Sequence, residues 1–282
     1  MAKVSRTVAR NADGLTSARA LVAARGSLRQ AVSNSVLKCT ALLACFELDG
    51  QELGVSDLAK RLGITASTAH RLANTLKQAR LLEQNPESEK YRLGLGIIEL
   101  NRLVMNGIPV RRLALPHLAT LASKSGANAN LGILWDDAVL YLARVPSPHA
   151  QDTYFHPGRK VPAHCTALGK ALLAALPEDE RRARLGRLTL SAHTSGTITD
   201  RARLEKHLVE VDLRGFSVDN EEYMIRTHCI GAPVRGTGGE LVGAISLSTT
   251  LLDMRHEDLL GHVPDLLEAA RATSYSMGHH LP

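Results

Sequence analysis

Polar side chains that can read base pairs gather in one short stretch, ASTAHRLANTL at residues 66–76. An arginine such as Arg71 can bond guanine, an asparagine such as Asn74 can bond adenine, and hydroxyl groups can bond bases or phosphates. The polar side of the expected helix consists of Ser67, Thr68, His70, Arg71, Asn74 and Thr75. This pattern predicts a helix that contacts the major groove of DNA.

The elements that must position this polar side are two short helices separated by Gly63. Ser56 is the expected N-cap of the first helix, and Gly63 ends that helix because glycine readily adopts the left-handed conformation. Thr65 is the expected N-cap of the second helix. The apolar stripe of the second helix consists of Ala69, Leu72, Ala73 and Leu76. These features predict a helix-turn-helix, and a plain helical hairpin with a solvated face is the alternative.

Residues 81–93 predict two short strands around a turn, which is the wing of a winged helix-turn-helix. Lys90 and Arg92 alternate with Tyr91 and Leu93. Because successive side chains of a strand point to opposite faces, the basic pair can face DNA phosphates while the apolar pair packs.

The charge of the chain is unevenly distributed. The net charge is +6, and residues 109–282 contain nineteen Lys or Arg and nineteen Asp or Glu, so the whole excess lies in the first 108 residues. A basic domain gains affinity for nucleic acid by releasing condensed counterions, so double-stranded DNA is the expected partner of this end. A solvated basic tail on an ordinary protein would give the same distribution.

Length and composition favour two domains, because 282 residues that are 44% hydrophobic can fill two cores. The N-terminus lacks the apolar core of a signal peptide, and no stretch approaches the roughly 18 apolar residues of a membrane span. The four cysteines form no CxxC pair, as is usual in a reducing compartment. We therefore expect a soluble cytoplasmic protein without membrane contacts.

The patterns along the chain divide it into four parts. Residues 1–27 have no apolar period, and apolar residues from Leu28 to Leu48 recur at helical spacing. Ile97 to Met105 predicts another helix. The expected parts are a flexible basic tail at 1–27, a winged helix-turn-helix DNA-binding domain at 28–94, a linker helix at 95–108 and a second domain at 109–282.

The second domain mixes strands and helices without a regular βαβ rhythm, which predicts an α+β fold with a mostly antiparallel sheet. A hairpin is expected where the Asp136–Asp137 turn separates two apolar strands. The expected strands are 129–134, 139–145, 216–218, 229–234 and 241–248, and the expected helices are 167–176, 204–213 and about 255–277, interrupted near Pro264.

Three stretches of this sequence resemble the IclR family of transcriptional regulators. They are LAKRLGITASTAHRLANTLKQARLLEQ with KYRLGLGIIEL, then GRKVPAHCTALGKALLA, and finally GFSVDNEEYMIRTHCIGAPVRGTGGELVGAISLS. The resemblance extends from about Leu28 to the last helix. It implies a C-terminal GAF-like effector domain that binds a small organic or aromatic acid, assembly into homodimers or homotetramers, and repression or activation of catabolic genes. It implies neither enzyme activity nor a cofactor.

The resemblance also implies an effector site. Its residues are Val161, Ala167 and Leu168 on one side and Asp219, Cys229, Ser246 and Ser248 on the other. A helix start at Ala167 favours a bound anion, and Ser246 and Ser248 lie two apart on one strand face. Asp219 can accept a hydrogen bond from a ligand hydroxyl, and Thr166 and His164 would affect which acid fits. Plain surface residues are the alternative reading of the serines and the aspartate.

His164–Cys165 and His228–Cys229 raise a different possibility, because histidine and cysteine bind zinc and form catalytic pairs. Their spacing is not that of a metal motif, and adjacent strand residues point to opposite faces, so we expect structural packing and no metal ligands. The alternative function is a small-molecule enzyme or metal-binding protein that uses His164, Cys165 and Cys229. A protein-interaction module with a helical N-terminus is a further alternative.

Overall fold

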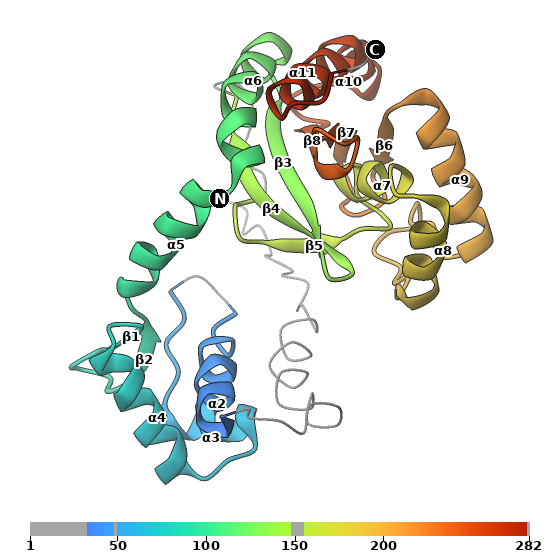
Figure 1. The fold of residues 1–282 in the computed structure, drawn as a ribbon. Helices are drawn as coiled ribbons and strands as arrows, with labels where there is room; N and C mark the ends of the chain where they lie inside the picture. Colours follow the sequence, from blue (N-terminus) through green and yellow to red (C-terminus); the bar gives the residue numbers. More distant parts are fainter. Residues whose placement is uncertain (1–32, 48–49, 148–154, 281–282) are drawn as a thin grey trace, which may run out of the picture. The chain divides into compact units, whose positions relative to one another are not determined.

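The computed structural model describes residues 33–47, 50–147 and 155–280, which form two compact units that join between Val104 and Met105. Figure 1 gives the order of the elements along the chain. The expected basic tail at 1–27 lies outside the described residues, as does the start of the helix expected from Leu28. Among the described helices, none is both long enough and apolar enough to cross a membrane.

The first unit is a helical domain with a small hairpin. Its elements are α2 (Asn34–Leu43), α3 (Val55–Leu62), α4 (Ala66–Gln78), β1 (Leu82–Gln84) and β2 (Tyr91–Leu93). The two strands are antiparallel, and Leu53 adds an isolated bridge to Tyr91. Its core includes the fully or almost fully buried side chains of Leu42, Leu58, Ala69, Leu82 and Tyr91.

Two of the helix ends predicted for this unit agree with the structure, and two differ from it. Gly63 has a φ of 63° in the left-handed region and ends α3, and the Thr65 hydroxyl accepts a 3.3 Å hydrogen bond from the Thr68 N–H. Ser56 is not an N-cap, because α3 begins one residue earlier and the Gly54 N–H donates to Asp57 Oδ2 at 3.1 Å. The expectation that the first helix continues to Leu48 is also wrong, since α2 ends at Leu43.

The expected linker helix is α5 (Gly96–Gly107), which spans the sequence boundary between the two units. It contains no buried residue. Four of its apolar side chains are between 54% and 62% exposed: Ile98, Leu100, Leu103 and Val104.

The second unit is built on a six-stranded, fully antiparallel sheet with the strand order β5-β4-β3-β8-β7-β6. Its strands are β3 (Asn128–Trp135), β4 (Ala138–Val145), β5 (Lys160–Pro162), β6 (Ser217–Asn220), β7 (Thr227–Arg235) and β8 (Leu241–Thr250). The expected α+β class and antiparallel sheet are therefore confirmed. Among the strands in the described part of the chain, the short strand β5 is the one that the sequence pattern did not predict.

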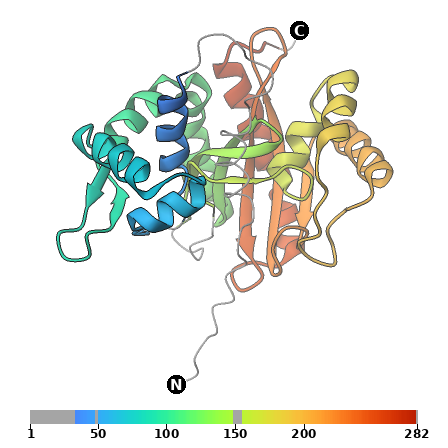
Figure 2. The same ribbon diagram turned by 90° about the horizontal axis from the view of Figure 1, so that it is seen from below.

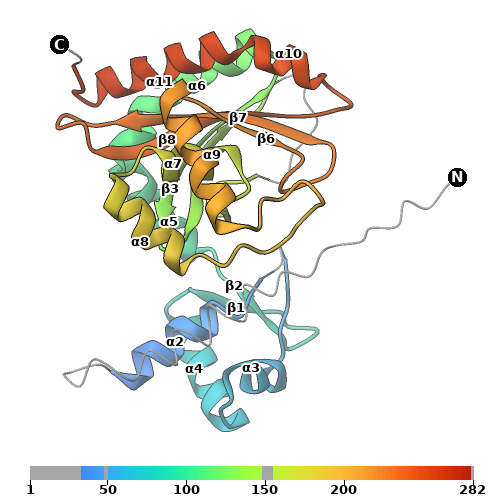
Figure 3. The same ribbon diagram turned by 90° about the vertical axis from the view of Figure 1, so that its right-hand side faces the viewer.

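Helices cover both faces of the sheet, as Figure 3 shows. On one face lie α6 (Pro109–Ser125), α10 (His256–Gly261) and α11 (Val263–Ser276). On the other lies α7 (Ala167–Ala174), which contacts α9 (Arg201–Arg214), and Figure 2 shows α9 beside α8 (Glu178–Arg187). Each face has its own apolar core.

Candidate functional sites

The polar side of α4 is exposed as expected. Ser67, His70 and Arg71 are exposed, while Leu72 and Ala73 on the opposite side are buried. Thr68 is half-buried, and its hydroxyl lies 2.9 Å from that of Thr65. The amphipathic pattern of the sequence thus places the Arg71 guanidinium where an external partner can reach it.

Asn74 is bonded within the unit. Its Oδ1 accepts a 3.0 Å hydrogen bond from the hydroxyl of the buried Tyr91, and its Nδ2 lies 3.3 Å from His70 Nε2. The Tyr91 backbone also exchanges hydrogen bonds of 2.8 and 2.9 Å with Leu53. Tyr91 therefore ties α4 to the hairpin that was expected to be the wing.

The two basic residues of the hairpin differ in their surroundings. Lys90 is exposed, whereas the Arg92 guanidinium donates to Glu83 Oε2 at 3.1 and 3.2 Å across the hairpin. The expected packing of Leu93 is wrong. Leu93 is the last residue of a three-residue strand and is 44% exposed, so Tyr91 alone anchors this strand to the core.

Two rows of mostly polar residues cross the α7 face of the large sheet. Strand register places each residue of a row directly opposite the next, so the residues of a row share a face. The first row is Asp219, Cys229, Ser248 and Asn128, and the second is Ser217, Gly231, Ser246 and Asn130. Four of the expected effector residues are therefore neighbours, although three different strands supply them.

The amide of Asn130 joins the two serines. Its Nδ2 donates to Ser248 Oγ at 3.0 Å and to Ser246 Oγ at 3.4 Å, which confirms that the serines share a face. Asn130 Oδ1 is buried and has no hydrogen-bond partner among the described residues. In the strand register Arg144 lies opposite Asn130. The sequence patterns had not pointed to Asn130 or Arg144, although polar Asn128 and Asn130 alternate in a strand.

The start of α7 is held against this face of the sheet. The Thr166 hydroxyl accepts from the Gly169 N–H at 3.2 Å and donates to the Pro162 carbonyl at 2.7 Å. Ser217 Oγ donates to the Ala167 carbonyl at 2.6 Å. A Cβ atom on Gly231 would lie 2.9 Å from that carbonyl, so glycine permits this close approach.

The other three expected effector residues, Val161, Ala167 and Leu168, are buried near the start of α7. Ala167 and Leu168 form the first turn of α7, and Val161 on β5 pairs with Val139. All four side chains belong to the apolar core on the α7 face.

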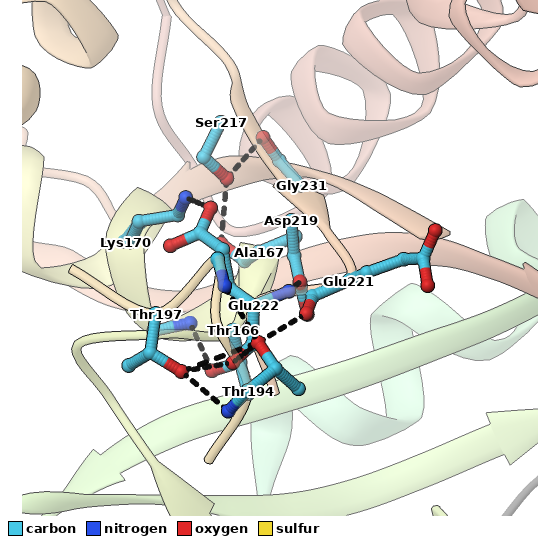
Figure 4. A network of polar contacts seen from close by, with 12 residues as sticks. Thr166, Ala167, Lys170, Thr194, Thr197, Ser217, Asp219, Glu221, Glu222 and Gly231 are labelled. Atoms are coloured by element: carbon cyan, nitrogen blue, oxygen red, sulfur yellow. Dashed lines mark hydrogen bonds and ion pairs between the residues drawn. The ribbon is translucent and has the colours of Figure 1, made fainter. Parts of the chain in front are cut away.

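A buried ion pair lies behind the first turn of α7. The ammonium group of Lys170 is fully buried and contacts Glu222 Oε1. The Glu222 N–H donates to Asp219 Oδ1 at 2.8 Å, and its carbonyl accepts from Thr197 Oγ1 at 2.6 Å (Figure 4). The Thr194 hydroxyl donates to the Glu221 carbonyl at 2.6 Å, so two threonines fix the segment that carries Glu222.

Asp219 is 1% exposed, and this burial raises the pKa of its carboxyl group to about 7. The ammonium of Lys170 and the N–H groups of Glu222 and Tyr223 oppose this rise, and the carboxylate of Glu222 adds to it. Removal from water disfavours the charged form of the carboxyl group. The folded protein therefore binds this proton more tightly than the unfolded chain does.

We predict that Asp219 makes the folded state progressively less stable as the pH rises from about 4, the pKa of an unfolded aspartate, to about 7. Asp219→Asn should remove this loss, because asparagine keeps an acceptor oxygen and carries no charge. Urea unfolding of both proteins from pH 4 to pH 8 measures it. The variant should gain stability over the parent as the pH rises, and a constant difference would contradict the assignment.

Aromatic rings line the region beside Asp219. Tyr141 and Phe155 stack with centroids 5.4 Å apart and an interplanar angle of 7°. Tyr223 lies 6.4 Å from Phe155 and 5.1 Å from His193, and His193 lies 5.9 Å from His164. These contacts join one row of rings from β4 to the segment after β5.

The two His–Cys pairs lie in different kinds of backbone structure. His228 and Cys229 are successive residues of β7, and the His228 ring contacts His256 while Cys229 belongs to the α7 core. His164 and Cys165 lie in a bend between β5 and α7, so the argument from alternating strand faces does not apply to them. One potential ligand atom each from His164, Cys165 and His193 lies within 4.8 Å of the others. The sequence reasoning missed His193.

Comparison with known families settles the classification. A model of the IclR helix-turn-helix domain matches residues 35–86, and a model of the bacterial transcriptional regulator IclR C-terminal domain matches residues 103–275. The chain belongs to the IclR family. Members of this family are transcriptional regulators, and this IclR-family chain carries the helix-turn-helix that implies DNA binding.

One relative and one solved structure support the same assignment over 88% of the chain, and a second structure shares the fold. The Escherichia coli (strain K12) regulator XynR is 31% identical over 88% of this chain and 98% of its own length. An IclR transcriptional regulator from Alicyclobacillus acidocaldarius is 26% identical over 88% of this chain and all of its own, with a TM-score of 0.77. An IclR homologue from Microbacterium hydrocarbonoxydans, complexed with 4-hydroxybenzoate, shares the fold at 24% identity and a TM-score of 0.74 over 86% and 99% of the two chains.

Proposed function

We propose that this IclR-family regulator is a cytoplasmic DNA-binding protein that senses a small organic or aromatic acid and thereby represses or activates catabolic genes. Its role is regulatory and not enzymatic. The observation that carries the proposal is the combination of an exposed basic helix in one unit with a buried polar sheet face in the other.

The proposed DNA contacts come from α4 and the hairpin. Arg71 is the best candidate for reading a base, because it is exposed on the polar side of α4. Lys90 is the best candidate for a phosphate contact, because it is exposed, whereas Arg92 must leave Glu83 to reach DNA. The remaining proposed contacts are Ser67, Thr68, His70 and Asn74. The Asn74 amide also contacts His70 and would orient its ring toward DNA.

The proposed effector site is the α7 face of the large sheet. Asn130 Oδ1 is a buried acceptor with no hydrogen-bond partner among the residues that the structure describes, so it can receive a hydrogen bond from a ligand hydroxyl. Arg144 lies opposite Asn130 in the register and would supply a guanidinium group for a carboxylate. The neighbouring Tyr141 and Phe155 rings suit an aromatic acid. Val161, Ala167, Leu168, Asp219, Cys229, Ser246 and Ser248 complete the proposed lining. A protein of the same fold binds 4-hydroxybenzoate.

The proposed assembly is a homodimer or homotetramer. The exposed apolar side chains of α5 support it, because Ile98, Leu100, Leu103 and Val104 lie within seven consecutive positions of one helix. A second copy of the same helix would remove this apolar surface from water.

A variant of Ser246 tests the proposed effector site. Thermal-shift screening of the full chain against organic and aromatic acids first identifies a stabilising ligand, which must bind the folded state. Ser246→Ala should then bind this acid about tenfold or more weakly. The variant loses the hydrogen bond that the Ser246 hydroxyl would donate to the carboxylate of the acid. Its affinity for a DNA duplex enriched from a random library should stay unchanged.

The exposed Ser276 on α11 offers a matched control, and Ser276→Ala should behave as the parent does. Unchanged acid binding by Ser246→Ala would refute the placement of the site. A complete lack of salt-dependent DNA binding by the parent would refute the proposed function itself.

A further inference from the structure

Three side chains with metal-binding atoms meet beside the bend between β5 and α7. One atom each of His164, Cys165 and His193 lies within 4.8 Å of the other two, in the part of the chain that the structure describes. Imidazole nitrogens and a thiolate sulfur are the ligands that zinc prefers in proteins. His164 and Cys165 are adjacent in sequence, and His193 comes from a distant segment, so folding creates the group.

The hydrogen bond of His164 leaves one ring nitrogen able to bind a metal ion. His164 Nε2 lies 3.0 Å from the carbonyl oxygen of Ser191. A carbonyl oxygen only accepts, so Nε2 carries the hydrogen and Nδ1 of the neutral ring keeps its lone pair. A bond from the second ring nitrogen to a backbone carbonyl is the usual way in which proteins orient a metal-binding histidine.

The backbone that carries these ligands is firmly held. A Cβ atom on Gly169 would lie 2.2 Å from the Ala163 carbonyl oxygen, which shows how closely α7 packs against the residue before His164. On the other side, the His193 N–H donates to Thr197 Oγ1 at 3.0 Å. His164 and Cys165 are buried, while His193 is exposed and gives an ion a route from solvent.

We propose that His164, Cys165 and His193 bind one Zn²⁺ ion. The Cys165 S–H releases its proton to solvent as the sulfur–zinc bond forms, so the bound group is a thiolate. Three protein ligands leave the fourth tetrahedral position to a water molecule or another small ligand. This site revises the expectation of no metal ligands, and it does not depend on which acid the protein senses.

Metal binding by the full chain tests the proposal directly. After treatment with a chelator, the parent should bind one Zn²⁺ per chain in isothermal titration calorimetry. His193→Ala should weaken binding at least tenfold, because one of three ligands is lost. Cys39→Ser, which changes a cysteine in the other unit, is the matched control and should bind as the parent does.

A cobalt spectrum separates a ligand from a residue that only supports the fold. Co²⁺ bound by the parent should give a sulfur-to-cobalt charge-transfer band in the near ultraviolet, and Cys165→Ser should lack this band while keeping the parent circular dichroism spectrum. No zinc uptake by the parent, or an unchanged band in Cys165→Ser, would overturn the proposal. Neither result bears on DNA binding, so failure here is distinct from failure of the proposed function.

Discussion

Replacing Lys170 with methionine should lower the free energy of unfolding of the second unit by about 3–5 kcal/mol. Methionine has a similar volume and removes the charge that faces Glu222. The Glu222 side chain is only 10% exposed, so its carboxylate would remain buried without a counter-charge. Urea unfolding followed by the fluorescence of Trp135 measures the loss. Trp135 is the one tryptophan of the chain and lies on β3 of the second unit.

The paired variant distinguishes lost charge pairing from lost packing. Adding Glu222→Leu to Lys170→Met removes both charges, and we expect the double variant to recover most of the lost stability. A double variant as unstable as the single variant would show that the Lys170 stem, and not its charge, matters. A loss below about 1 kcal/mol in the single variant would indicate that Glu222 is already solvated.

Replacing Arg71 with alanine should weaken binding to the preferred DNA duplex by about 1–3 kcal/mol and relax the sequence preference at one base pair. The cause is the loss of a guanidinium that is exposed on α4. Lys90→Ala should instead weaken binding to all sequences alike and lower the salt slope by about 1, as expected for one phosphate contact. Fluorescence anisotropy at several salt concentrations separates the two effects.

An arginine outside the first unit provides the control for this experiment. Arg271 is exposed on α11, and Arg271→Ala removes the same charge from the second unit. It should bind DNA as the parent does. If Arg71→Ala and Lys90→Ala both bound DNA as tightly as the parent does, the proposed DNA contacts of α4 and the hairpin would be wrong.

Elements with strong local signals could be predicted from the sequence. The helical spacing of Ala69, Leu72 and Leu76 and the cap at Thr65 predicted α4, and Gly63 ends α3 in the left-handed conformation as expected. The helix α6 was missed because Pro109 reads as a stop and Pro116 interrupts its pattern. Its buried face, which includes Leu118 and Leu121, becomes apparent only against the sheet.

The candidate sites could be predicted only in part, because most of their contacts join distant residues. Ser246 and Ser248 share a strand, so their common face follows from the sequence alone. Their bonds to Asn130 depend on the β3–β8 register, which no local pattern encodes. The same holds for the approach of His193 to Cys165, and for Lys170, whose partner lies 52 residues away.

The bond between Tyr91 and Asn74 has a consequence for control of the protein. Tyr91 joins the hairpin to α4 by its side chain and to Leu53 by its backbone, so these contacts of the helix-turn-helix unit are already formed without DNA. Contacts that are formed before binding reduce the ordering entropy that opposes docking. In the dimer that we propose, a bound acid would accordingly act on the separation of the two DNA-binding domains, which must match the helical repeat of the duplex.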